Sequence, residues 1–149
     1  MSRAHGSITP RIYSRPVRFV LFFSALVLVA AGCGARSNTP YTAKGSAGCL
    51  KSKGFNGVTT NPAKVGFIAG FAANGGILAT APSGNQVTIA FAEDADGVPS
   101  TEQSFRLHAS PALRPHIGDV MRSNRNAVIV WTTTPSSEDS SGVEGCLEP

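Results

Sequence analysis

The chain has 149 residues, of which 13 are Lys or Arg and nine are Asp or Glu, giving a formal net charge of +4. Four of the 13 basic residues, Arg3, Arg11, Arg15 and Arg18, come before position 19, so nine basic and nine acidic residues remain after them. This neutral remainder has no basic cluster interleaved with aromatic residues, which argues against nucleic acid as a partner. The length allows one modest core and excludes two lobes around a cleft.

The N-terminal segment is typical of an export signal. The four arginines come first, without an acidic residue among them, and 19–31 is a run of 13 uncharged, almost wholly apolar residues. A membrane-spanning helix needs roughly 20 apolar residues, whereas the apolar part of a secretory signal needs only about 7 to 15. We therefore expect 1–32 to be a signal peptide that is removed from the mature protein.

The residues at 28–33, Leu-Val-Ala-Ala-Gly-Cys, resemble the lipobox of bacterial lipoproteins, although Ala30 stands where that motif prefers Leu. The resemblance implies that Cys33 becomes the lipid-bearing first residue of the mature protein. The chain would then be anchored on the extracytoplasmic face of the cell membrane, where another envelope protein could be its partner. Two alternatives stay open. One is an uncleaved signal anchor, with 17–34 as a short membrane helix, and the other is ordinary cleavage that leaves Cys33 unmodified.

The segment after the lipobox is expected to be a flexible tether. Residues 33–45 are rich in Gly, Ser, Asn, Thr and Ala, and such a segment cannot bury enough apolar surface to offset the entropy of ordering it. The tether would hold a folded domain, 46–149, clear of the lipid headgroups. Tyr41 is expected to pack back on that domain.

The cysteine count agrees with export. If Cys33 carries lipid, Cys49 and Cys146 remain as a pair, and an oxidising exterior favours a disulfide between them. This disulfide would close nearly the whole domain and contribute about 4 to 5 kcal/mol in the chain-entropy model. Two independent buried thiols are the alternative.

The first part of the domain gives mixed signals. Ser46 predicts a helix over 47–53, and an extended stretch is expected around Val58. In 61–76 a good helix opening is followed by glycines that cost roughly 1 kcal/mol each inside a helix. Either a loop or a weak helix is expected there.

Two β-hairpins are predicted in the middle of the domain. The aliphatic runs 77–81 and 86–92 are joined by Pro-Ser-Gly-Asn at 82–85, which has turn chemistry at every position. A second hairpin is expected over 119–133. Its strand 127–131 consists of five apolar residues in a row, which predicts a strand covered on both faces.

Capping signals predict two later helices and complete the fold. Ser100 opens a helix that runs to about Ala109, and Ser136 opens a last helix that carries Cys146. The expected fold is α+β: a small two-layer domain with an antiparallel sheet of about four strands, helices on one face and one disulfide.

The mature part also resembles a group of known proteins. Its motifs are a Cys-Leu pair near the start, Gly-Asn-x-Val-x-Ile-x-Phe at 84–91, Asn-x-Val-Ile-Val-Trp at 126–131 and a closing Cys-Leu pair. They resemble small exported or membrane-tethered bacterial proteins over most of 46–148. The shared motifs are a turn, two strands and a disulfide, so the resemblance implies no activity.

The candidates for chemistry are His108 and His116, together with nearby carboxylates: Glu93, Asp94, Asp96 and Asp119. The two histidines are eight residues apart across two prolines, which matches no metal-ligand spacing, so no metal or cofactor is expected. The acidic segment 93–97 lacks the spacing of an EF-hand loop and is expected to be a solvated turn. Trp131 is either the core anchor of its strand, which is favoured, or an exposed aromatic residue for a ligand.

Two classes of function remain. The favoured one is a membrane-anchored cell-envelope lipoprotein with a non-catalytic binding or structural role. The other is a small envelope hydrolase or metal-dependent enzyme that uses His108 or His116. No catalytic residue is assigned, because the sequence has no Gly-x-Ser-x-Gly elbow, no phosphate-binding Gly-rich loop and no Cys-x-x-Cys pair.

Overall fold

The structure is a computed structural model that describes residues 39–149. The expected signal peptide, Cys33 and the first part of the expected tether lie outside these residues. Within 39–149, no helix is both long and apolar enough to cross a membrane. In chain order the elements are α1 (Ala43–Ser52), β1 (Asn56–Thr59), α2 (Phe67–Gly70), β2 (Gly76–Thr80), β3 (Gln86–Phe91), α3 (Val98–His108), the 3-10 turn η1 (Arg114–His116), α4 (Ile117–Val120), β4 (Met121–Asn124), β5 (Ala127–Trp131) and α5 (Ser137–Glu144).

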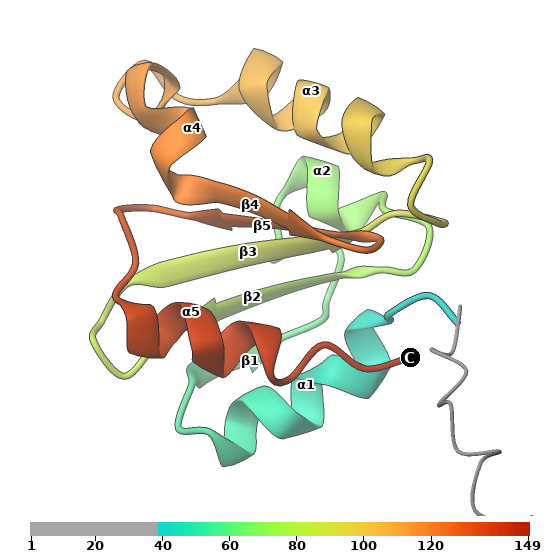
Figure 1. Ribbon diagram of the computed structural model, residues 1–149, viewed down its shortest axis with the longest axis vertical. Coiled ribbons are helices and arrows are strands. Elements are labelled where there is room, and N and C mark those ends of the chain that lie inside the picture. The colour runs from blue at the N-terminus through green and yellow to red at the C-terminus, as the bar shows by residue number, and fades with distance from the viewer. Residues whose placement is uncertain (1–38) are drawn as a thin grey trace, which may run out of the picture. The chain divides into compact units, whose positions relative to one another are not determined.

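Five antiparallel strands form one sheet in the order β1-β2-β3-β5-β4 (Figure 1). Ile77, Ile89 and Ile129 lie opposite one another across its three central strands. The α+β class is confirmed, as are the hairpins β2–β3 and β4–β5. The sheet has one strand more than expected, because the extended stretch around Val58 pairs with β2 as β1.

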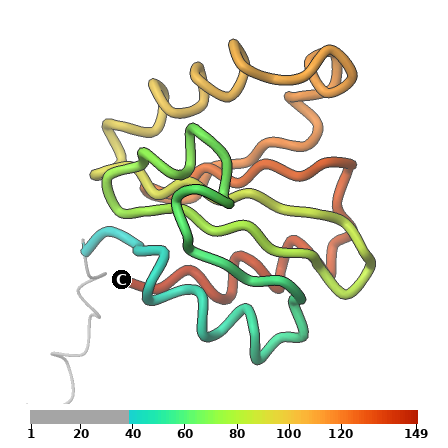
Figure 2. The backbone as a smooth tube through the Cα atoms, turned by 180° about the vertical axis from the view of Figure 1, so that it is seen from behind, coloured from blue at the N-terminus to red at the C-terminus, as the bar shows by residue number. Residues whose placement is uncertain are grey.

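Helices cover both faces of the sheet, whereas the sequence predicted them on one. The helices α1 and α5 lie on one side, and α2, α3 and α4 lie on the other, as Figures 1 and 2 show from front and back. We call these sides the α1–α5 face and the α2–α3 face. The physical reason lies in β5, all of whose residues are buried, since a strand buried on both sides needs cover on both sides. The domain therefore has three layers instead of two.

The two faces are packed with side chains of different size. On the α1–α5 face, Ile89 of β3 belongs to a core cluster with Leu50 of α1 and Val143 of α5. The next residue of the strand, Ala90, points the other way and clusters with Ala69 of α2. Large side chains thus fill one face of β3, and small ones bring α2 close to the other.

The predicted disulfide is confirmed. Cys49 of α1 is bonded to Cys146, just after α5, with 5.3 Å between their Cα atoms, which is within the usual range of about 4.4 to 6.8 Å. The alternative of two independent thiols is therefore wrong. The bridge joins the first helix of the domain to its last on the α1–α5 face.

The folded part begins earlier than predicted. Helix α1 starts at Ala43, and Thr42 caps it by accepting a hydrogen bond from the backbone N–H of Gly45 at 3.0 Å. Ser46 is instead buried, and its Oγ accepts a hydrogen bond from the backbone N–H of Glu148 at 3.0 Å. Residues 39–45, expected as the end of the tether, thus belong to the folded domain. Tyr41 packs against the core, as predicted.

The later helices follow the capping signals in part. Ser136 caps α5 by accepting from the backbone N–H of Asp139 at 3.0 Å, as predicted, but the helix ends before Cys146. Helix α3 begins at Val98 with a proline in its first turn, a position that suits proline because no N–H is needed there. Ser100 is therefore inside the helix and donates to the carbonyl oxygen of Gly97 at 2.9 Å.

Candidate functional site

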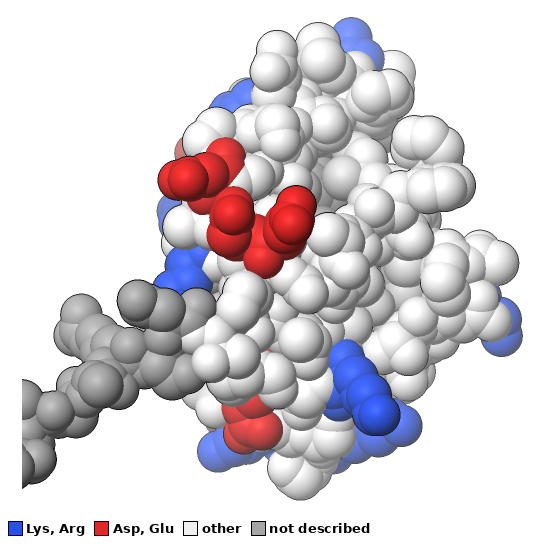
Figure 3. Space-filling view, turned by 90° about the vertical axis from the view of Figure 1, so that its right-hand side faces the viewer, with Lys and Arg blue, Asp and Glu red and all other residues white. Residues whose placement is uncertain are grey.

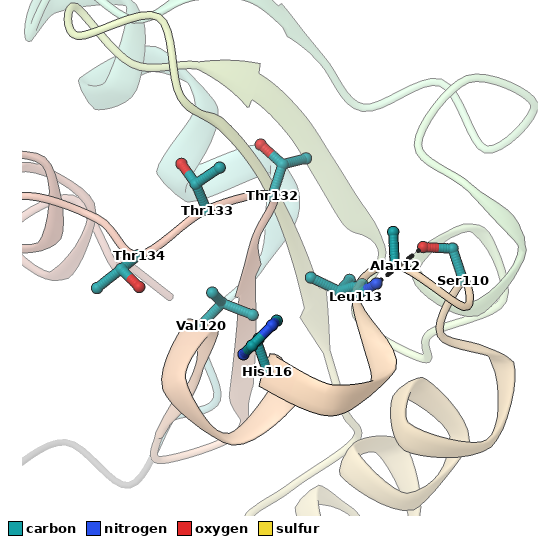
Figure 4. A pocket seen from close by; sticks show the side chains of 8 residues that line it. All are labelled: Ser110, Ala112, Leu113, His116, Val120, Thr132, Thr133 and Thr134. Carbon is teal, nitrogen blue, oxygen red and sulfur yellow. Dashed lines mark hydrogen bonds between the residues drawn. The ribbon is translucent and has the colours of Figure 1, made fainter.

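One candidate histidine lines a hollow on the α2–α3 side of the molecule. The side chain of His116 lies at the edge of a cavity of about 400 Å³ between the α3–α4 connection and the segment after β5 (Figure 4). His116 Nδ1 is 4.0 Å from a carboxylate oxygen of Asp119, and the two side chains are 69% and 72% exposed. An ion pair between such exposed groups is weak. The cavity is lined by Ser110, Ala112, Leu113, His116, Val120, Thr132, Thr133 and Thr134.

The other candidate histidine belongs to a different hollow. His108 ends α3, where its Nδ1 is 2.9 Å from the carbonyl oxygen of Ser104, and it faces α2. Of the acidic candidates, Asp94 accepts hydrogen bonds from the backbone N–H groups of Asp96 and Gly97. This carboxylate therefore shapes the turn before α3, as expected of 93–97. Within 39–149 no three His, Cys, Asp or Glu side chains are grouped so as to hold a metal ion.

Two of the four hydroxyl side chains that line the hollow around His116 bond to nearby groups of the protein. Ser110 Oγ accepts from the backbone N–H of Leu113 at 3.3 Å, the dashed line in Figure 4. Thr132 Oγ1 donates to Asn85 Oδ1 at 2.9 Å. Among the described residues, the polar contact found for the His116 side chain is the one with Asp119. This hollow can contact a small molecule, but its hydroxyl groups are not paired with a base that would activate one of them.

A longer depression lies between α2 and α3. Two hollows of about 390 Å³ each share Phe67, Ile68 and His108, and together we call them the α2–α3 groove. The deeper part is apolar and reaches Phe105 and Leu113, whereas the outer part is lined by small residues of both helices. Those small residues are Ala72, Ala73, Gly97, Ser100, Thr101 and Ser104.

The short helix α2 is packed by its small residues. A Cβ atom added to Gly70 would lie 2.6 Å from the carbonyl oxygen of Pro62, and one added to Gly76 would lie 2.6 Å from Cβ of Ala69. Real side-chain atoms do not approach so closely, so only glycine fits at both contacts. The large residues Phe67 and Phe71 consequently point outward and are 73% and 80% exposed. The sequence prediction of a loop or weak helix over 61–76 did not identify this surface.

A buried asparagine holds the start of the described chain in place. Asn126 Nδ2 donates to the carbonyl oxygens of Tyr41 at 3.0 Å and Ala92 at 2.8 Å, and its Oδ1 accepts from the backbone N–H of Tyr41 at 2.8 Å. The guanidinium of Arg125 lies 4.4 Å from the centre of the Tyr41 ring. Residues 39–41 are therefore fixed against the β4–β5 turn. The role of Asn126 depends on hydrogen bonds to residues far away in the sequence. Local sequence patterns therefore could not predict it.

The remaining site predictions concern Trp131 and the three cysteines. Trp131 is 2% exposed and belongs to the main core cluster, in agreement with its interpretation as the core anchor of the strand. Cys49 and Cys146 form the disulfide, and Cys33 lies outside the described residues.

Comparisons of the chain with protein-family models, with curated proteins and with solved structures found no match. Function is therefore inferred from the sequence and the geometry together.

Proposed function

We propose that this chain is a cell-envelope lipoprotein, tied to the outer face of a membrane by acyl chains on Cys33, with a binding or structural role instead of a catalytic one. The observation that carries the proposal is the cysteine arrangement. Of the three cysteines, Cys49 and Cys146 form the disulfide. The third, Cys33, directly follows the small residues that end the apolar run, where the lipobox places the lipid-bearing cysteine.

The disulfide supports export independently of the signal sequence. Stable disulfides form and persist outside the cytoplasm, whereas reducing systems keep most cytoplasmic thiols free. A lipid anchor then explains how a domain without a membrane-spanning helix in 39–149 could stay at a membrane. Each buried methylene contributes about 0.8 kcal/mol, so two acyl chains hold a protein stably where one would be marginal.

A binding role is supported by the α2–α3 groove. Its two hollows fall within the size range of ligand sites, and its deeper part is apolar. The alternative, a hydrolase or metal-dependent enzyme, has less support. His108 and His116 line different hollows, and the carboxylate next to His116 is as exposed as the histidine itself.

The proposal is tested by labelling bacteria that express the full chain with a radioactive fatty acid. We expect label on the native chain and none on Cys33→Ser, which should also move from the membrane fraction to the soluble fraction. The matched control is Cys49→Ser/Cys146→Ser, which removes the other two thiols and should keep the label. A native chain that takes up no label and yet stays in the membrane fraction would favour an uncleaved signal anchor and overturn the proposal.

A further inference from the structure

Two phenylalanines are exposed at α2: Phe67 is the first residue of this short helix, and Phe71 directly follows its last residue. The rings of Phe67 and Phe71 are neighbours, with 5.0 Å between their centres and an angle of 54° between their planes. The close contacts at Gly70 and Gly76 hold the backbone of α2 against Pro62 and the start of β2. Both aromatic rings lie outside these contacts and are mostly exposed.

A third large apolar side chain is exposed on α3. Leu107 of α3 is 65% exposed, and it follows Ser100 by two helical turns, so both point to the same side of α3. Ser100 and Phe71 line the same hollow. Phe67 and Phe71 thus line the α2–α3 groove, and Leu107, which lines neither of its hollows, is exposed beside it on the Ser100 side of α3. Clustered exposed apolar residues mark a surface that contacts something else.

The described chain starts at the same end of the molecule as this surface. Pro40 lines a small hollow with Asp94 and Ala95, and that acidic loop continues to Glu93 and Gly97, which line the groove beside Phe71. The backbone N–H of Ala43 also donates to the carbonyl oxygen of Asn74 at 3.0 Å, three residues after Phe71. In Figures 1 and 2 this start and the loop that follows α2 lie at the same end of the sheet.

The distance to a membrane anchor would be short. Five residues separate Cys33 from Thr39, and a chain of that length spans at most about 20 Å when fully extended. A contact held within such a distance has an effective concentration on the order of millimolar, so even a weak surface interaction is populated. Asn126 fixes residues 39–41, so the anchor would lie within this distance of the β4–β5 turn.

We propose that the α2–α3 face docks on the bilayer to which Cys33 is tied, with Phe67 and Phe71 entering the boundary between headgroups and acyl chains; this rests on the lipid anchor proposed above. Aromatic and leucine side chains are those that interfacial segments bury at this depth. Figure 3 shows a cluster of acidic side chains on this end of the molecule, beside a broad surface without charge. Zwitterionic lipid, which does not repel carboxylates, is therefore the suitable probe.

The test uses the full lipid-bearing chain, purified from membranes and reconstituted into phosphatidylcholine vesicles with or without bromine on the acyl chains. Phe71→Trp places a reporter on the face, and Ser137→Trp is the matched control at the exposed start of α5. Both variants are measured against the native chain, whose one tryptophan, Trp131, is buried in the core. We expect the emission that Phe71→Trp adds to that of the native chain to be lost in brominated vesicles, and the emission that Ser137→Trp adds to be unchanged. Adding Phe67→Ser and Leu107→Ser to Phe71→Trp should restore most of the emission.

Flotation of the vesicles separates the two proposals. If the protein floats with the vesicles and bromine does not quench Phe71→Trp, docking is overturned and the lipid anchor stands. If the emission shifts to the blue without quenching and the shift grows with protein concentration, the face binds a second copy of the chain, which also overturns docking. If the protein does not float, the lipid anchor fails, and docking fails with it.

Discussion

The two faces of this sheet are built in opposite ways. On the α1–α5 face, large apolar side chains such as Leu50 and Val143 are fully buried, and a disulfide joins the two ends of the cover. On the α2–α3 face, glycine and alanine hold α2 against the sheet, and Phe67 and Phe71 point to solvent beside a groove. One face is therefore closed by large buried side chains and a disulfide. The other leaves two large aromatic side chains exposed to solvent.

The first test of this difference between the faces removes the Cys49–Cys146 disulfide on the α1–α5 face. Cys49→Ser/Cys146→Ser should lower the free energy of unfolding by about 4 to 5 kcal/mol, because the unfolded chain regains the entropy of a loop that spans most of the domain. Denaturant unfolding measures the loss, and the native protein in reductant is the control. Equal midpoints for the oxidised and reduced protein would show that the bridge does not stabilise the domain.

The second test compares two phenylalanines. Phe91 of β3 is fully buried, so Phe91→Ala should cost about 3 to 5 kcal/mol through lost burial and a residual cavity. Phe71→Ala, the same change on the other face, should alter the free energy of unfolding by no more than about 0.5 kcal/mol, because the ring is exposed. Comparable losses for the two variants would contradict the difference between the faces.

A third test concerns the start of the described chain. Asn126→Ala removes three hydrogen bonds from a buried side chain and should cost about 1 to 3 kcal/mol, the range for leaving buried polar groups unsatisfied. Hydrogen exchange at the Tyr41 amide should become faster. Asn124→Ala, on the neighbouring β4, is the control and should leave that exchange unchanged. Unaltered protection of Tyr41 in Asn126→Ala would show that residues 39–41 are held by other contacts.

The smallest expected effect is at His116. The side chain is exposed and its partner Asp119 is exposed too, so His116→Ala should change the free energy of unfolding by less than about 0.5 kcal/mol. Thermal unfolding of the two proteins checks this. A larger loss would show that the His116 side chain makes stabilising contacts beyond the one with Asp119.

Local signals in the sequence identified the hairpins, the cap of α5 and the cysteine pair. The turn 82–85 and the buried strand β5 are determined by the types of their own residues, so both could be predicted. The start of α1 could not, because Thr42 and Ser46 are both good caps, and the contact of Ser46 with Glu148 decides between them. The aromatic face was missed for a similar reason. Whether glycine or phenylalanine of α2 points inward depends on Pro62 and Gly76, which only the fold brings close.

The most direct test of the central claim is the intact mass of the protein isolated from the cells that make it, before and after reduction. We predict a chain that begins at Cys33, carries the added mass of acyl chains, and gains the mass of two hydrogens on reduction of the Cys49–Cys146 bridge. A chain that still begins at Met1, without added lipid mass, would contradict the account.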